Sequence, residues 1–430
     1  MSWMFSEHEL NERIELNYRR LLCDPYYGID EVFAPADYDW YGDKEGRALL
    51  AFVCHYKMHG RRIPCMDEMI VRYPSMANER LFFGPLAGEV IHEQQLSGHS
   101  WLLRGLCEYY EQFSDPFVLE IVNSICQNLY LPTVGRYKSY PIDRTKKSEG
   151  GVSGSTVGHV DGWELSSDIG CAFMSIDGLS HAYAVSRDAR VLALLDEMIG
   201  VYLAIDKRAL RAQTHCTLTA ARGMMRLYSV TGEGRYLDGA RAIFELYTKG
   251  GGMTATYQNV NWWGRCDTWT EPCAIVDAMM LAALLYRAEG KEEDRRIAAR
   301  IYHNGLATAQ RDNGGAGTDT VVTREEGGTD TLRALMYEAY FCCTMRLAEG
   351  LWFVRENKSL FAAQVTGTVR REENGSYMDG DILYAEITGA DRYLLTPAVA
   401  IDGHRLHPLL KAYTVPREQL HAIAQRVLFP

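Results

Sequence analysis

The most constraining feature of the sequence is a recurring pattern in which an apolar helical run, a short polar turn and a second helical run follow one another. The pattern occurs around residues 113–117, 186–191, 231–237 and 289–294. Its irregular spacing, roughly 45 to 70 residues, is unlike a short-period solenoid. Repeated helical hairpins predict a closed toroid of alternating inner and outer helices, and six such pairs fit the first 355 residues.

The predicted fold class is therefore all-α dominated, an (α/α)6 barrel over residues 1–357 with a small β-containing C-terminal cap over 358–430. Beyond Lys358 the pattern changes to short β-like runs at Leu360–Val365 and Asp381–Ile387, and Asn374-Gly375 between them is a turn signal. A closing helix is expected from Pro416 to Val427. About 70 residues is small for an independent sandwich, so we expect these residues to pack on the barrel.

Composition narrows the classes of partner. The chain has 430 residues, 47% hydrophobic and 23% charged, with a net charge of −11. This balance favours a soluble globular protein and argues against nucleic acid or an anionic membrane as partner, because both require clustered cations. We read no signal peptide and no membrane-spanning run, so the expected location is the cytoplasm. The expected ligand is small or neutral, and a homodimer is left open.

The cysteines divide into two groups by position. Eleven are present, an odd number, and most are scattered without a repeating spacing, as in a protein with reduced thiols. Buried small hydrophobic side chains explain those cysteines best. The exceptions are Cys266, Cys273 and the adjacent pair Cys342-Cys343.

Two segments about 70 residues apart combine these cysteines with a glutamate. Glu271 and Cys273 come just before one apolar helical run, and Cys342 and Cys343 come just before another. Thiolate and carboxylate are both good Zn²⁺ ligands, and a helix start favours anionic side chains. The sequence therefore predicts a zinc site made of Glu271, Cys273, Cys342 and Cys343. The alternative is a set of buried structural thiols beside a capping glutamate.

Several polar and aromatic side chains are candidates for substrate binding. If the inner helices share a direction, residues at their N-termini converge on one mouth of the barrel, which would gather His99 and His215. Aromatic faces beside a polar site suit carbohydrate stacking, and Tyr257, Trp262 and Trp263 precede the proposed ligands. Core positions are the alternative for all five. The polar segment 143–170 is too long for an ordinary connection and is expected to be a lid or partly mobile.

At this point the residues resemble a known family. The segments that carry the resemblance run in the same order between about residue 90 and about residue 365: Gln95–His99, the run from His215 to Leu237, Glu271–Cys273, Tyr302–Leu306 and Cys342-Cys343. Together they look like glycoside hydrolase family 127, the β-L-arabinofuranosidases. The resemblance implies an (α/α)6 barrel, a Cys3Glu zinc site and a retaining mechanism in which Cys342 is the nucleophile.

The sequence departs from this family at the expected proton donor. The family places an acid/base glutamate about sixteen residues before the ligand glutamate, but residues 251–258 contain no carboxylate. Without a positioned acid the reaction forfeits ~10²–10⁴-fold in rate. Asp267, Glu338 and Tyr257 are the candidate substitutes, unless the substrate has a good leaving group or the reaction is not simple hydrolysis. The chain also stops too soon to contain in full the β-sandwich domains that family members carry after the barrel.

The function expected from these observations is a zinc-dependent, retaining glycosidase-like enzyme that acts on a short furanoside, such as a β-L-arabinofuranoside, with a small oligosaccharide or glycoside as substrate. Two alternatives remain. One is another toroid enzyme such as a sugar epimerase, which would need paired histidines, with His99 and His215 as candidates. The other is a non-catalytic sugar-binding protein that keeps zinc as a structural clip.

Overall fold

The computed structural model describes residues 7–33, 40–142, 154–322, 335–362, 370–372, 377–387, 392–395 and 413–416. Its contacts divide the chain into two compact units. The first contains residues 1–20 and 244–430, and the second contains residues 21–243. Helices α1 (Glu7–Cys23) and α11 (Gly234–Lys249) each cross a boundary between the units.

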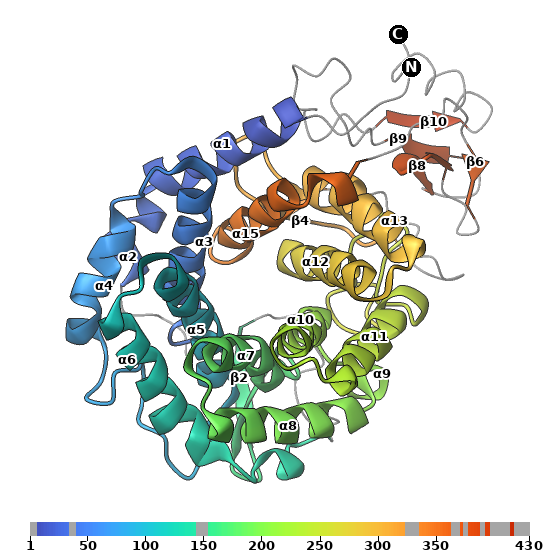
Figure 1. Ribbon diagram of the computed structural model, residues 1–430. Coiled ribbons are helices and arrows are strands. Elements are labelled where there is room, and N and C mark those ends of the chain that lie inside the picture. The colour runs from blue at the N-terminus through green and yellow to red at the C-terminus, as the bar shows by residue number, and fades with distance from the viewer. Residues whose placement is uncertain are drawn as a thin grey trace. The chain divides into compact units, whose positions relative to one another are not determined.

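In its described residues, the second unit is helical apart from one small sheet (Figure 1). Its helices are α2 (Ile29–Val32), α3 (Asp43–His59), α4 (Cys65–Met76), α5 (Glu93–Phe113), α6 (Pro116–Ile125), α7 (Ser175–Ser186), α8 (Ala189–Ala204), α9 (Lys207–Leu210) and α10 (Thr214–Thr231), followed by most of α11. Helices α3, α5, α7 and α10 bury most of their side chains. Helices α5 and α7 approach closely because Gly178 has no side chain, and a Cβ there would lie 2.5 Å from the Ser100 carbonyl oxygen.

The four helix–turn–helix signals read from the sequence are confirmed. They join α5 to α6, α7 to α8, α10 to α11, and α12 (Pro272–Glu289) to α13 (Glu292–Arg300). Each first helix ends on a left-handed residue, namely Ser114, Arg187, Gly232 and Gly290. At two of the turns an aspartate caps the next helix: Asp115 accepts from the Phe117 amide and Asp188 from the Arg190 amide, both at 2.9 Å.

Part of the segment expected to be a lid has regular structure. Strands β2 (Thr156–Val160) and β3 (Trp163–Ser166) form an antiparallel hairpin, and β3 also pairs with β1 (Ile91–His92) in parallel. Residues 143–153 of that segment lie outside the described residues. The remaining residues are therefore a hairpin tied to the start of α5, and the lid function stays a prediction.

The described residues of the first unit combine helices with two sheets. Besides most of α1, its helices are α12, α13, a π-helical segment (Ile301–Leu306), α14 (Ala307–Ala309) and α15 (Cys343–Glu356). Strands β4 (Gly317–Asp319) and β5 (Leu335–Glu338) form an antiparallel pair. A second, antiparallel sheet has the order β10-β9-β8-β7-β6, with β6 (Arg370–Arg371), β7 (Tyr377–Asp379), β8 (Ile382–Ile387), β9 (Arg392–Leu395) and β10 (Tyr413–Pro416).

This five-stranded sheet is the predicted β-containing C-terminal part. Strand β8 confirms the expected run ending at Ile387. Leu360 instead ends a 3-10 turn, and residues 363–365, the Asn374-Gly375 turn and residues 417–427 of the expected closing helix lie outside the described residues. The sheet contacts its own unit, because the Asn304 side chain donates to the Asp381 carbonyl oxygen at 3.2 Å. The domain boundary at residue 357 stays a prediction.

In the parts of the chain that the structure describes, no helix is both long enough and apolar enough to cross a membrane.

Candidate metal centre

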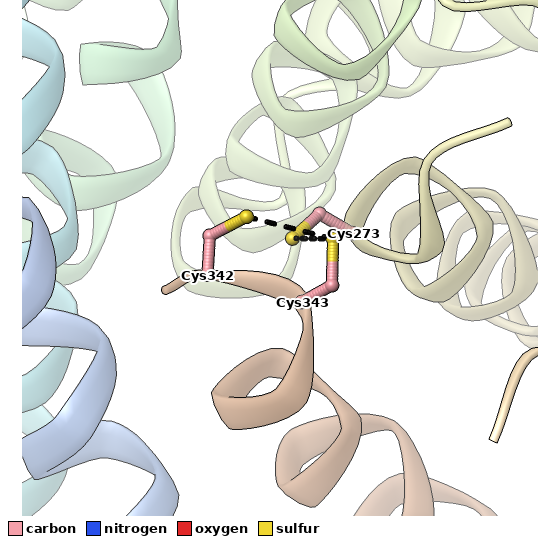
Figure 2. A group of neighbouring side chains, drawn as sticks. All are labelled: Cys273, Cys342 and Cys343. Atoms are coloured by element: carbon pink, nitrogen blue, oxygen red, sulfur yellow. Dashed lines mark hydrogen bonds between the residues drawn. The ribbon is translucent and has the colours of Figure 1, made fainter. Parts of the chain in front are cut away.

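Three cysteine thiols from two helices meet at one point in the first unit (Figure 2). The Cys273 thiol lies 3.4 Å from the Cys343 sulfur, and the Cys342 and Cys343 sulfurs are 3.5 Å apart. Cys273 and Cys343 are buried, whereas Cys342 is half-buried. The structure therefore confirms that two segments remote in the sequence bring these thiols together.

A ladder of backbone pairs explains why the two segments meet. Strand β4 pairs with β5, which leads into Cys342. Just beyond β4, Thr320 forms an antiparallel bridge with Trp269, which lies just before α12. The Thr270 amide also donates to the Asp319 carbonyl oxygen at 2.9 Å. Strand β4 thus holds both helix starts, and the thiols at those starts come together.

The helix starts themselves are fixed by local bonds. Pro272 occupies the first position of α12, where its missing N–H costs nothing. Cys342 is the N-cap residue of α15, and its carbonyl oxygen accepts from the Arg346 amide at 3.1 Å. The Thr344 hydroxyl accepts from the Ala316 amide at 2.9 Å, which ties α15 to the residue before β4.

Helices α12 and α15 are also neighbours that contact each other (Figure 1). A Cβ at Gly350 would lie 2.9 Å from a Val276 methyl group, so only glycine permits this approach. One turn beyond the thiols, Arg346 donates to Asp277 Oδ1 at 2.5 Å and pairs with Glu349. All three side chains are at most 1% exposed. A buried charged network therefore joins the two helices that carry the sulfurs.

Glu271 lies beside this cluster. One of its carboxylate oxygens is within 4.8 Å of the Cys273 sulfur, although the group of three mutually close sulfurs does not include it. With the Asn261 amide oriented to satisfy both partners, its nitrogen donates to Glu271 Oε2 at 2.8 Å and its oxygen accepts from Trp269 Nε1 at 3.1 Å. The Glu271 amide donates to Asn259 Oδ1 at 2.9 Å. The side chains of Asn259 and Asn261 thus fix the predicted fourth ligand.

The thiol cluster suits a soft divalent cation. Burial and the two neighbouring thiols raise the pKa of Cys343 well above its usual value, so this thiol stays protonated when no cation is bound. A bound metal deprotonates a coordinating thiol. Sulfurs around a tetrahedral zinc ion at 2.3 Å stand roughly 3.8 Å apart. The observed separations of 3.4 and 3.5 Å need only a small outward movement.

The three candidate proton donors have partners of their own. Glu338 accepts from Arg20 at 2.6 Å and from Asn313 at 2.7 Å. Asp267 is 63% exposed and pairs with Arg265 at 2.8 Å. The Tyr257 hydroxyl accepts from Arg300 at 3.1 Å and contacts Met378 Sδ at 3.6 Å.

The predicted aromatic stacking residues are core residues. Trp262 and Trp263 are fully buried, and Tyr257 is 4% exposed. A Cβ at Gly252 would touch the Trp263 ring, which shows how tightly that ring is enclosed. None of the three offers a free ring face, so their role in stacking stays a prediction without a supporting contact.

The two predicted histidines lie in the second unit. His99 is fully buried: Nε2 accepts from the Phe83 amide at 3.0 Å and Nδ1 donates to the Gln95 carbonyl oxygen at 2.8 Å. Burial lowers the pKa of His99 to about 4, so the ring is neutral. His215 is buried in the first turn of α10, and its ring stacks on Trp101 at 5.8 Å.

Sequence reasoning missed Asn261 and the network of Asp277, Arg346 and Glu349. A signal for the network existed, because a charged residue stands alone within each of two apolar runs, Val276-Asp277-Ala278 and Met345-Arg346-Leu347. Such residues are rarely buried without partners. No comparable pattern marks Asn261.

Comparison with known proteins gives structural matches only. No family model matches the sequence, and no curated protein matches it. Solved structures that match include a β-arabinofuranosidase of glycoside hydrolase family 127, at 11% identity over 92% of this chain and 64% of that one, TM-score 0.53. A family 127 β-L-arabinofuranosidase from Geobacillus stearothermophilus T6 matches at 13% identity, over 92% and 73% of the two chains, TM-score 0.52. A sugar epimerase from a ruminal bacterium matches at 13% identity, over 81% and 97%, TM-score 0.54.

These matches show the class of fold. The chain has the all-α dominated (α/α)6 toroid fold of such glycoside hydrolases and epimerases, as the helical hairpins predicted. Within that class, the cluster of Cys273, Cys342 and Cys343 is a group that could hold a metal ion. The chain spans under two thirds of the first arabinofuranosidase it matches, so that enzyme's activity is not carried over from the fold.

Proposed function

We propose that the protein is a zinc-dependent retaining glycosidase that acts on a short furanoside of the β-L-arabinofuranoside type. The single observation that carries the proposal is the convergence of Cys273, Cys342 and Cys343 at the adjacent starts of α12 and α15. Three thiols and the nearby Glu271 carboxylate form a donor set that zinc accepts well. The resemblance of the sequence motifs to family 127 supports the same assignment.

Cys342 is the sulfur best suited to attack a substrate. It is half-buried, whereas Cys273 and Cys343 are buried. Zinc, when bound, would keep the thiols ionised at neutral pH. The Cys342 sulfur would then displace the leaving group at the anomeric carbon, and water would release the sugar from sulfur with overall retention. Glu271 would complete the ligand set, held in place by Asn261.

Two measurements on the purified full chain test this function. Metal analysis is expected to find about one zinc per chain. A cysteine-reactive β-L-arabinofuranosyl analogue is then expected to label Cys342, as mapped by peptide mass spectrometry. Cys266 is the matched control, because it is also half-exposed and belongs to the same unit. Labelling of Cys266 and Cys342 to the same extent would indicate simple thiol reactivity, and a metal-free, unlabelled protein would refute the proposal.

A sugar epimerase is the second candidate. Its support is that this chain covers 97% of the matched epimerase but only 64% of the first arabinofuranosidase. The acid and base of an epimerase would then be sought among histidines such as His215, and zinc would be a structural clip. Loss of epimerisation in His215→Asn with zinc retained would favour this candidate, as would full activity of Cys342→Ser.

A further inference from the structure

Four aromatic side chains adjoin the two segments that carry the thiols, and we call them the aromatic rim: Trp269, Tyr337, Tyr340 and Phe341. Three of them are well exposed, Tyr337 at 40%, Tyr340 at 46% and Phe341 at 38%. The rings of Trp269 and Tyr337 meet edge to face at 6.0 Å, and those of Tyr340 and Phe341 at 5.7 Å. The rim thus consists of two edge-to-face pairs, and exposed aromatic groups of this kind often mark a binding surface.

The rim belongs to the thiol site by chain connection. Phe341 directly precedes Cys342, and Trp269 stands two residues before Glu271. Strand β4 holds both segments, through its pairing with β5 and through the bridge between Thr320 and Trp269. Tyr340 and Phe341 are therefore the two residues that directly precede the half-buried Cys342.

The proton donors supply an independent observation about the leaving group. Glu338 and Asp267 are each paired with an arginine, and Tyr257 is packed against Met378 and Arg300. In these contacts each of the three side chains is held by a group other than the thiols. A group that departs without protonation suits such a site, and a phenol, with a pKa of about 10, leaves as its anion far more readily than an alcohol.

We propose that the aromatic rim binds an aryl aglycone, so that the substrates are aryl glycosides; this rests on the proposed function. The Cys342 thiolate forms a bond to the anomeric carbon as the bond from that carbon to the aryl oxygen breaks. The electron pair leaves on the aryl oxygen, and the phenolate takes its proton from water. Water then adds to the anomeric carbon, the sulfur departs as thiolate, and the proton of that water goes to solvent.

Calorimetry on the zinc-loaded full chain tests the rim without turnover. The probes are phenyl and methyl 1-thio-β-L-arabinofuranosides, which carry the same sugar. The phenyl compound is expected to bind about tenfold more tightly. The double variant Tyr340→Ala/Phe341→Ala is expected to bind both compounds alike, with methyl affinity unchanged. Phe341→Leu, which keeps apolar volume but removes a ring, should lose part of the preference.

Tyr286→Ala is the matched control. Tyr286 is a half-buried tyrosine thirteen residues after Cys273 on the same helix, about 20 Å along its axis. This variant should keep the phenyl preference. Zinc content measured on every variant shows that the thiol site is intact.

The outcomes separate the two proposals. Equal binding of both probes, or a preference that survives in the double variant, overturns the aryl assignment while the sugar site stands. Tighter binding of a thio-linked disaccharide than of the phenyl compound would overturn it in favour of a sugar ring. If neither probe binds and Cys342 is not labelled by the reactive analogue, the proposed function itself fails, and the aryl assignment fails with it.

Discussion

Replacing Arg346 by methionine is expected to destabilise the first unit strongly. Arg346 is fully buried and pairs with Asp277 on α12 and Glu349 on its own helix. Methionine fills much of the same volume but leaves both carboxylates buried beside an apolar chain. Breaking a buried ion pair by removing one partner costs about 3–5 kcal/mol, because the remaining charge is uncompensated.

Urea unfolding of Arg346→Met, followed by circular dichroism with and without chelator, measures this cost. Arg19→Met is the matched control, since Arg19 pairs with Glu15 on the surface with 69% of its side chain exposed. Arg19→Met should lower the free energy of unfolding by less than about 1 kcal/mol. The variant Asp277→Leu/Arg346→Met/Glu349→Leu should recover most of the stability, because it buries no charge.

A chelator competition on the same proteins measures whether the network also positions the thiols. Asp277 is one turn beyond Cys273, and Arg346 is one turn beyond Cys342. Zinc affinity should therefore fall in Arg346→Met but not in Arg19→Met. If Arg346→Met were no less stable than Arg19→Met, the reasoning about buried charge would be refuted.

Three further predictions follow from contacts described above. Asn261→Ala should weaken zinc binding by roughly 10–100-fold, because it frees the Glu271 carboxylate. Asn11→Ala, on the exposed face of α1, should leave zinc binding unchanged. Equal zinc affinities of the two variants in a competition titration would contradict this prediction. The pKa of His99 falls from 6.5 to about 4 on burial, so the unfolded chain takes up a proton that the folded chain does not; stability should drop by roughly 3 kcal/mol as pH falls from 6.5 to 4, and denaturation of His99→Gln should show a shallower pH slope. All eleven cysteines are free thiols, so titration in denaturant should return eleven per chain, and a lower value without reductant would reveal a disulfide.

Sequence patterns predicted the fold class because its signals are local. A residue such as Asp115 followed by Pro116 starts a helix through its own capping bond, and Gly232 ends one through its own backbone conformation. A chain of helical hairpins repeated in this way is compatible with only a few architectures. At Leu360, where a strand was expected to begin, the chain ends a 3-10 turn instead, because a short apolar run fits a 3-10 turn as well as a strand.

The site was predicted in part. The thiols of Cys273, Cys342 and Cys343 could be grouped from the sequence because zinc ligands form a small chemical set at helix starts. The aromatic residues could not be sorted, since burial is a property of the folded chain: Trp262 is enclosed while Phe341 is exposed, and their sequence surroundings do not distinguish them. The bond between Asn261 and Glu271 joins two loop residues whose spacing follows no regular period.

Helix α1 is synthesised early, but it is bonded to residues around the thiol site that are synthesised much later. The Asn17 side chain on α1 donates to the carbonyl oxygens of Gly314 and Thr344, which lie 297 and 327 residues later in the chain. Arg20 likewise reaches Glu338, just before the cysteine pair. At 5–20 residues per second, a ribosome needs about 15–60 s to deliver these partners after α1 has emerged. In the cell, metal binding would therefore occur late in synthesis. Helix α1 would remain without these partners until the later residues have been made.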